Sequence, residues 1–163
     1  MKKLVLLSLS LLMSVTAFAQ VKVNVDNPEV SIQFKRCIAT GNIAYLDFIM
    51  INNSGKEMAL DLKMWSKDAI RAYDDEGNGY TSYDGDRVIK SIDFAGHRFT
   101  FYESDRRYVF PTEVPIKGRI EIRDVDEYAT SFLKVIVDVY DWTYGTKYHN
   151  FKIEFKNVPI TRQ

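Results

Sequence analysis

The chain of 163 residues carries 22 basic and 22 acidic side chains, so its formal net charge is zero. This balance argues against a nucleic-acid or anionic-membrane partner, because both attract proteins with clustered positive charge. The single cysteine, Cys37, cannot form an internal disulfide, so a domain of this length must be stable through its apolar core alone.

Residues 1–19 have the pattern of a cleaved export signal. Two lysines precede an apolar run over residues 4–15, and a small-x-small site, Ala-Phe-Ala, stands before Gln20. The run is too short for a membrane anchor, and glutamine after the site does not support lipid attachment, which needs cysteine there. The sequence therefore predicts one mature domain over residues 20–163, periplasmic or secreted, without a membrane span. An uncleaved first strand is the alternative.

Cleavage before Gln20 would also change the charge balance. It removes two lysines and no acids, so the mature chain keeps 20 basic and 22 acidic residues. A slightly acidic domain is again unsuited to a nucleic-acid partner.

Alternation of apolar and polar residues with a period of two dominates the chain from Glu29 onward. Turn residues separate the alternating runs, and no run has the 3.6-residue period of a long helix. The pattern predicts an all-β fold, an antiparallel β-sandwich of seven to nine strands, with a closed barrel as the alternative. The expected strands cover residues 30–38, 43–51, 58–64, 69–73, 88–94, 98–102, 116–122, 131–144 and 147–158.

The first two of these strands carry specific expectations. Val30, Phe34 and Ile38 share one face of the first strand, and a bulge at Arg36–Cys37 would turn the thiol into the core. A buried apolar thiol is then expected, with an exposed reactive thiol or an intermolecular disulfide as the alternatives. The second strand, 43–51, is apolar on both faces, which is typical of a central strand covered on both sides.

The last two expected strands can pair as a hairpin in a register that keeps both of their apolar faces inside the core. Pairing Val139 with Ile153 satisfies this condition and leaves residues 145–147 as a three-residue loop. The apolar faces comprise Leu133, Val135, Val137 and Val139 on one strand and Phe151, Ile153 and Phe155 on the other.

This register places aromatic side chains on the outer face of the hairpin. Tyr140, Trp142, Tyr144 and Tyr148 would form an exposed aromatic stripe. Rigid aromatic faces are favoured where sugars or proteins dock, because they offer a large contact area at little entropic cost. The sequence predicts an exported, non-catalytic binding module that contacts a protein or a glycan through these residues. Alternatively, the aromatics support one another across the strands or lie beneath the N-terminal segment.

Several motifs resemble those of small immunoglobulin-like domains of unknown function in secreted bacterial proteins. The resemblance implies an immunoglobulin-like sandwich and an exported, non-catalytic interaction module, and it provides no catalytic residue. The chain lacks the Cys-Trp-Cys arrangement of antibody domains. The motifs are the inward Phe34 and Cys37, the strand end Ile51-Asn52-Asn53-Ser54-Gly55, the turn from Ala72 to Tyr80, and Val114-Pro115-Ile116-Lys117-Gly118.

Two acidic loops contain weak candidate calcium ligands: Asp74, Asp75, Glu76 and Asn78 in the first, and Asp84 and Asp86 in the second. Calcium prefers closely spaced carboxylate and carbonyl oxygens, but the first loop lacks the twelve-residue spacing and the closing glutamate of an EF-hand. A hairpin turn with Gly77 at positive φ is the favoured interpretation. We therefore expect neither a metal nor a cofactor.

No catalytic pattern stands out along the chain. His97 and His149 are far apart in sequence, and no Ser/His/Asp signature accompanies them, so we expect no enzymatic activity. Two other functions remain open. An envelope assembly subunit could donate the short strand 21–25 to a partner sheet, and, least favoured, a hydrolase could use two facing carboxylates.

Overall fold

The computed structural model describes residues 20–66, 69–82, 88–100, 102, 107–143 and 150–163. The strands within these ranges are β1 (Lys22–Val25), β2 (Val30–Thr40), β3 (Ile43–Asn52), β4 (Met58–Asp61), β5 (Ile70–Asp74), β6 (Gly79–Thr81), β7 (Ile89–Phe94), β8 (His97–Thr100), β9 (Tyr108–Phe110), β10 (Ile116–Ile122), β11 (Ser131–Asp141), β12 (Phe151–Pro159) and β13 (Thr161–Arg162).

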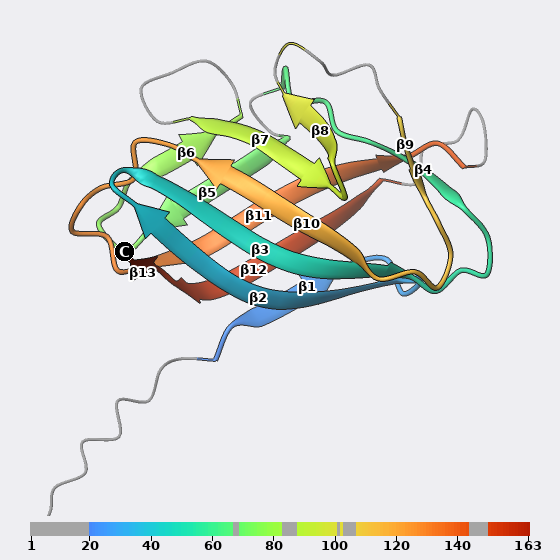
Figure 1. The fold of residues 1–163 in the computed structure, drawn as a ribbon, viewed down its shortest axis with the longest axis horizontal. Coiled ribbons are helices and arrows are strands. Elements are labelled where there is room, and N and C mark those ends of the chain that lie inside the picture. The colour runs from blue at the N-terminus through green and yellow to red at the C-terminus, as the bar shows by residue number, and fades with distance from the viewer. Residues whose placement is uncertain (1–19, 67–68, 83–87, 101, 103–106, 144–149) are drawn as a thin grey trace, which may run out of the picture.

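These strands form two sheets that pack face to face (Figure 1). The seven-stranded sheet has the order β1-β12-β11-β4-β9. In the same sheet, β5 also pairs with β11, and β6 pairs with β5. The six-stranded sheet has the order β13-β2-β3-β10-β7-β8. The paired strands are antiparallel except for β13, which runs parallel to β2. The all-β sandwich is therefore confirmed.

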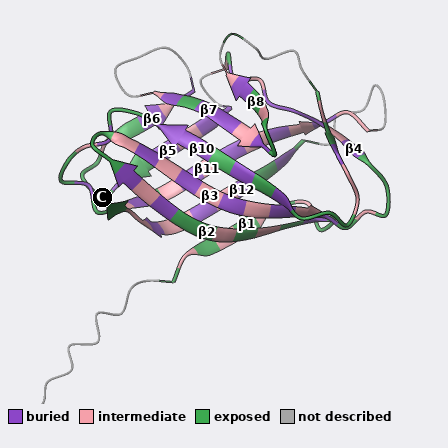
Figure 2. Cartoon of the chain, viewed as in Figure 1, coloured by how far each residue is buried: buried purple, intermediate pink, exposed green. Residues whose placement is uncertain are grey.

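The core lies between the two sheets. Along the long strands, buried residues alternate with partly exposed ones, as Figure 2 shows. Phe48 of β3 and Phe155 of β12 meet across the core, with their ring centroids 5.4 Å apart. The described residues form more strands than the seven to nine expected, because several strands have only two to four residues, which is too short for alternation to reveal.

A bulge in β2 turns Cys37 inward, as expected. The register with β3 shifts between Phe34 and Arg36, so Lys35 is the extra residue. Cys37 and Ala39 are buried, while Ile38 is only partly buried on the opposite face. The prediction that Ile38 shares the inner face was wrong, because the bulge reverses the alternation beyond it.

Only one face of β3 is covered by the core. Leu46 and Phe48 are buried, but Tyr45, Asp47 and Ile49 on the outer face are partly exposed. The expectation of a strand covered on both sides was wrong. Side chains of neighbouring strands contact this outer face instead, such as Arg119, which lies over the Tyr45 ring.

The register of the last hairpin differs from the expected one by two residues. Val139 lies opposite Phe151, and Val137 lies opposite Ile153. A shift of two keeps every side chain on its face, so the buried positions of Val135, Val137 and Val139 were predicted correctly although the pairing was not. The expected loop, residues 145–147, lies outside the described part of the chain.

Leu133 was also predicted on the inner face and lies outside it. Its side chain is 52% exposed, while the preceding Phe132 is fully buried. The pairing of β11 with β5 is irregular between Phe132 and Lys134, which changes the alternation at the start of β11.

The N-terminal strand belongs to the chain's own sheet. β1 pairs antiparallel with β12, from Lys22 opposite Lys156 to Val25 opposite Ile153. The Asp26 carboxylate accepts a hydrogen bond from the backbone N–H of Lys152 and so extends this pairing. This arrangement counts against the donation of the strand to a partner sheet. No helix in the described residues is long and apolar enough to cross a membrane.

Candidate functional site

Two of the predicted site residues lie side by side on the outer face of β11. Tyr140 and Trp142 are partly buried, and the intervening Asp141 points into the molecule and is buried. Here β11 pairs with β4, so Tyr140 lies opposite Asp61. The backbone N–H of Trp142 donates to the carbonyl of Ala59 at 2.8 Å, which continues the pairing beyond the last strand residue.

The segment after β4 adds a third aromatic residue to this face. The fully buried residues Leu60, Leu62 and Met64 alternate with residues that become more exposed along the segment, from Asp61 at 8% onward. One of these is Trp65, which is 51% exposed. The ammonium of Lys63 lies 4.2 Å from the ring centroid of Tyr140 and 6.0 Å from that of Trp65.

A second cation covers the third ring. The guanidinium of Arg107 lies 4.3 Å from the ring centroid of Trp142. Contacts of this kind stabilise a cation and hold the ring in one orientation. We call Trp65, Tyr140 and Trp142, together with Lys63 and Arg107, the aromatic surface. A cation of the chain therefore lies near each of its three rings.

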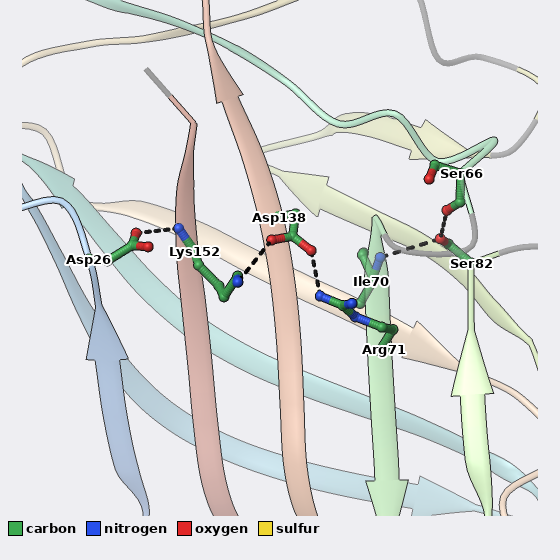
Figure 3. Close-up of polar contacts among 7 residues, drawn as sticks. All are labelled: Asp26, Ser66, Ile70, Arg71, Ser82, Asp138 and Lys152. Carbon is green, nitrogen blue, oxygen red and sulfur yellow. Dashed lines mark hydrogen bonds and ion pairs between the residues drawn. The ribbon is translucent and has the colours of Figure 1, made fainter. Parts of the chain in front are cut away.

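A small polar pocket of about 100 Å³ adjoins Tyr140. Asp138 is one of its lining residues, and it also accepts a hydrogen bond from Nη2 of Arg71 at 2.7 Å and lies 3.8 Å from Nζ of Lys152 (Figure 3). The pocket therefore contains a carboxylate whose position is determined by two cations on neighbouring strands. The described residues that line it are Ser66, Ala69, Asp138, Val139, Tyr140 and Asn150.

The other wall of this pocket is held by hydroxyl hydrogen bonds. Ser82 Oγ donates to the backbone carbonyl of Ser66 at 2.7 Å and accepts from the backbone N–H of Ile70 at 3.3 Å (Figure 3). Ser82 is buried, and its hydroxyl joins the backbone at Ser66 to the backbone at Ile70. Ser66 lines the pocket and directly follows Trp65, so the pocket adjoins the aromatic surface.

Of the four aromatic residues predicted from the sequence, the structure brings Tyr140 and Trp142 together. Tyr144 and Tyr148 lie outside the described residues. Trp65 was missed, although the alternation of Leu60, Leu62 and Met64 already indicated that it points outward. Local pattern does not predict that this segment pairs with β11, because the contacts join residues about 80 positions apart.

The first acidic loop is a turn whose carboxylates are already used. The buried carboxylate of Asp74 accepts hydrogen bonds from the backbone N–H groups of Glu76 and Asn78, the side-chain amide of Asn78 and the Tyr80 hydroxyl. Gly77 has a φ of 85°, as the expected hairpin turn requires. These contacts leave Asp74 little capacity for a metal ion.

Asp75 has a similar role at the start of β11. Its carboxylate accepts hydrogen bonds from the backbone and hydroxyl groups of both Thr130 and Ser131. Partial burial acts to raise the pKa of Asp75, but these hydrogen bonds outweigh it and hold the pKa below its ordinary value. No group of three potential metal-ligating side chains occurs among the described residues. Asp84 and Asp86 lie outside them.

His97 packs against aromatic side chains. Its ring centroid lies 4.8 Å from that of Phe99 and 5.5 Å from that of Tyr108. These contacts explain why a histidine is placed at the edge of the core on β8. His149 lies outside the described residues.

The fold and this site define a β-sandwich that presents an aromatic surface on its seven-stranded sheet. No protein-family model matches the chain, and neither a curated protein nor a solved structure matches it significantly. The resemblance to immunoglobulin-like domains of secreted bacterial proteins therefore stays a prediction.

Proposed function

We propose that the protein is an exported, non-catalytic binding module that recognises a glycan through the aromatic surface. The observation that carries this proposal is that Tyr140 lines a polar pocket and shares its neighbouring ammonium, that of Lys63, with the exposed Trp65 ring. Sugars combine apolar C–H faces with hydroxyl groups, so their binding sites combine aromatic rings with a few polar side chains.

The pocket offers polar groups that suit sugar hydroxyls. Asp138 can accept hydrogen bonds, Asn150 can both donate and accept them, and Ser66 adds a hydroxyl. At about 100 Å³ the pocket has room for a ring substituent rather than a whole sugar. The remainder of the ligand would lie on the exposed ring of Trp65.

A role in binding rather than hydrolysis is supported by the carboxylates near the pocket. Glycoside hydrolysis needs two carboxyl groups on opposite sides of the scissile bond. Asp138 is the one carboxylate among the described residues that line the pocket, and it forms an ion pair with Arg71.

The proposal is tested by screening the purified protein against immobilised neutral and acidic glycans. Trp65→Ala and Tyr140→Ala should each abolish retention of the glycans that the unmodified protein binds. Tyr128→Ala is the matched control, because Tyr128 is 71% exposed and takes no part in the aromatic surface. Binding that survives both substitutions would overturn the proposal. Capture of a protein instead of a glycan, with loss in the same variants, would assign the surface to a protein partner.

Export is tested separately. The protein recovered from the envelope or the medium of its source cells should begin at Gln20 when its N-terminus is determined by mass spectrometry. Recovery of the intact chain from the cytoplasm would contradict it.

A further inference from the structure

The outer face of the six-stranded sheet carries a row of alternating charges. Arg36 of β2 lies opposite Asp47 of β3, and Asp47 lies opposite Arg119 of β10. Arg119 in turn lies opposite Asp93 of β7, and Asp93 lies opposite Arg98 of β8. The five residues therefore form one line across five strands, perpendicular to the strand direction.

An open groove of about 880 Å³ follows this row. Tyr45 and Ile49 contribute part of its floor, and Lys35 and Lys117 add ammonium groups beside the row. The described residues that line the groove include five cations and three acids, Glu121 being the third acid. This local excess of positive charge occurs in a chain whose formal net charge is zero.

The guanidinium groups in the groove are positioned but not saturated. Arg119 binds Asp47 through Nε at 2.6 Å and Nη2 at 3.0 Å, and Arg36 binds the same carboxylate through Nε at 2.8 Å. Arg98 uses Nη2 to bind Glu121 at 2.8 Å. Each guanidinium has five N–H donors, so each retains donors beyond these bonds.

These arginines are also accessible. The side chains of Arg36, Arg119 and Arg98 are 59%, 50% and 49% exposed. Arg119 lies over the ring of Tyr45, 5.2 Å from its centroid, which limits the orientations of its guanidinium. Partial burial acts to raise the pKa of Asp47, but the bonds from Arg119 and Arg36 hold it below its ordinary value, so this carboxylate stays charged.

We propose that this groove binds an acidic polysaccharide whose carboxylates are bound by Arg36, Arg119 and Arg98. Guanidinium groups are well suited to this ligand, because they bind carboxylates through two parallel hydrogen bonds. Asp47 and Asp93, which alternate with the arginines, can accept hydrogen bonds from the sugar hydroxyls between two carboxylates.

The spacing of the arginines favours a polysaccharide over a peptide. They occupy every second strand, so successive arginines start about 9.5 Å apart across the sheet. Carboxylates on alternate sugars of an extended chain have a similar spacing. Side chains on one face of an extended peptide recur about every 6.7 Å, which does not fit. The intervening acids would repel a polyanion with denser charge, such as a nucleic acid.

Calorimetric titration with a hyaluronan oligosaccharide, which carries one carboxylate on every second sugar, tests the proposal. We expect binding that weakens as salt is added, because exposed charges are screened. Arg119→Ala should weaken it about tenfold or more. Lys117→Glu should also weaken it. Lys117 is exposed and belongs to none of the ion pairs among the described residues, so this variant keeps the test independent of folding. Lys22→Ala, which removes a cation from β1 of the other sheet, is the control and should bind normally.

Three results would overturn the proposal: no binding of the oligosaccharide, equal binding of a neutral chitin oligosaccharide, or an equal loss of affinity in Lys22→Ala. Tighter binding of poly-glutamate would assign the groove to an acidic protein segment instead. The groove and the aromatic surface lie on opposite sheets, so Trp65→Ala should not change hyaluronan binding. The proposal for the groove and the proposal for the aromatic surface can therefore fail independently of each other.

Discussion

The phenyl ring of Phe48 occupies the space next to Gly118 that any other residue would need for its side chain. A β-carbon at Gly118 would lie 2.2 Å from Cζ of Phe48. The two residues are directly opposite each other in β3 and β10, and the ring also packs against Phe94 and Phe155. It therefore cannot move aside without disturbing the contact between the sheets.

Gly118→Ala should destabilise the protein by about 1–3 kcal/mol, because it overfills a packed core. The free energy of unfolding in urea measures the effect. Gly79→Ala is the control, since a β-carbon there meets Tyr73 only at 3.7 Å and should change stability by about 0.5 kcal/mol or less. Equal stabilities of the two variants would contradict the packing argument.

The contact between Phe48 and Gly118 is only partly predictable from the sequence. In the expected strand 116–122, Ile116, Gly118 and Ile120 alternate with charged residues, which predicts that they face the core, and they are buried. The alternation could not reveal that Phe48 requires a glycine there, because that depends on which strands become neighbours. Local pattern predicts the face of a residue, whereas the partner across the sheet is set by the tertiary fold.

Asp74→Ala should destabilise the protein by about 2–4 kcal/mol, because it leaves the Tyr80 hydroxyl and the amide groups of Asn78 without their buried acceptor. Thermal unfolding measures this loss, with Glu76→Ala in the same turn as the control.

Calcium should not raise the melting temperature of the unmodified protein relative to a chelator. A clear calcium-dependent rise that disappears in Asp74→Ala would instead show that the turn is a metal site.

Acid should remove a contribution to stability at Glu154. The hydrogen bond from Lys134 lowers the pKa of Glu154 most. Partial burial acts to raise this pKa, but further hydrogen bonds from Lys156 and Asn24 lower it, and the pKa of Glu154 is about 2. A carboxyl with a lowered pKa stabilises the folded state above its unfolded pKa of about 4.5, and this is lost as the pH falls toward 2. Glu154→Gln should therefore lose less stability than the unmodified protein between pH 5 and pH 2. The urea midpoint across this range measures it, and identical slopes for the two proteins would contradict the assignment.

The candidate sites were less predictable than the core. Tyr140 and Trp142 were identified because they continue the alternation of a clear strand. The groove was missed, and the signal lay in the strand that was expected to be covered on both sides. Tyr45, Asp47 and Ile49 occupy the outer face of this strand and line the groove. An acid between two large apolar residues indicates a face that is partly exposed and contacted by long polar side chains. Those side chains come from β2 and β10, whose positions the sequence does not reveal.

The thiol of Cys37 should be unreactive toward thiol reagents in the folded protein. Its side chain is 2% exposed, and burial, with a smaller effect of the Asp47 charge, raises the pKa of the thiol to about 12. Because the thiolate is the reactive form, a thiol reagent such as Ellman's reagent should label Cys37 only when the chain unfolds. The labelling rate should rise with urea in parallel with the unfolded fraction, and Gly118→Ala should be labelled faster because it unfolds more often. Rapid labelling of the native protein at neutral pH would instead favour the exposed reactive thiol, and a disulfide-linked dimer on a non-reducing gel would favour an intermolecular bond.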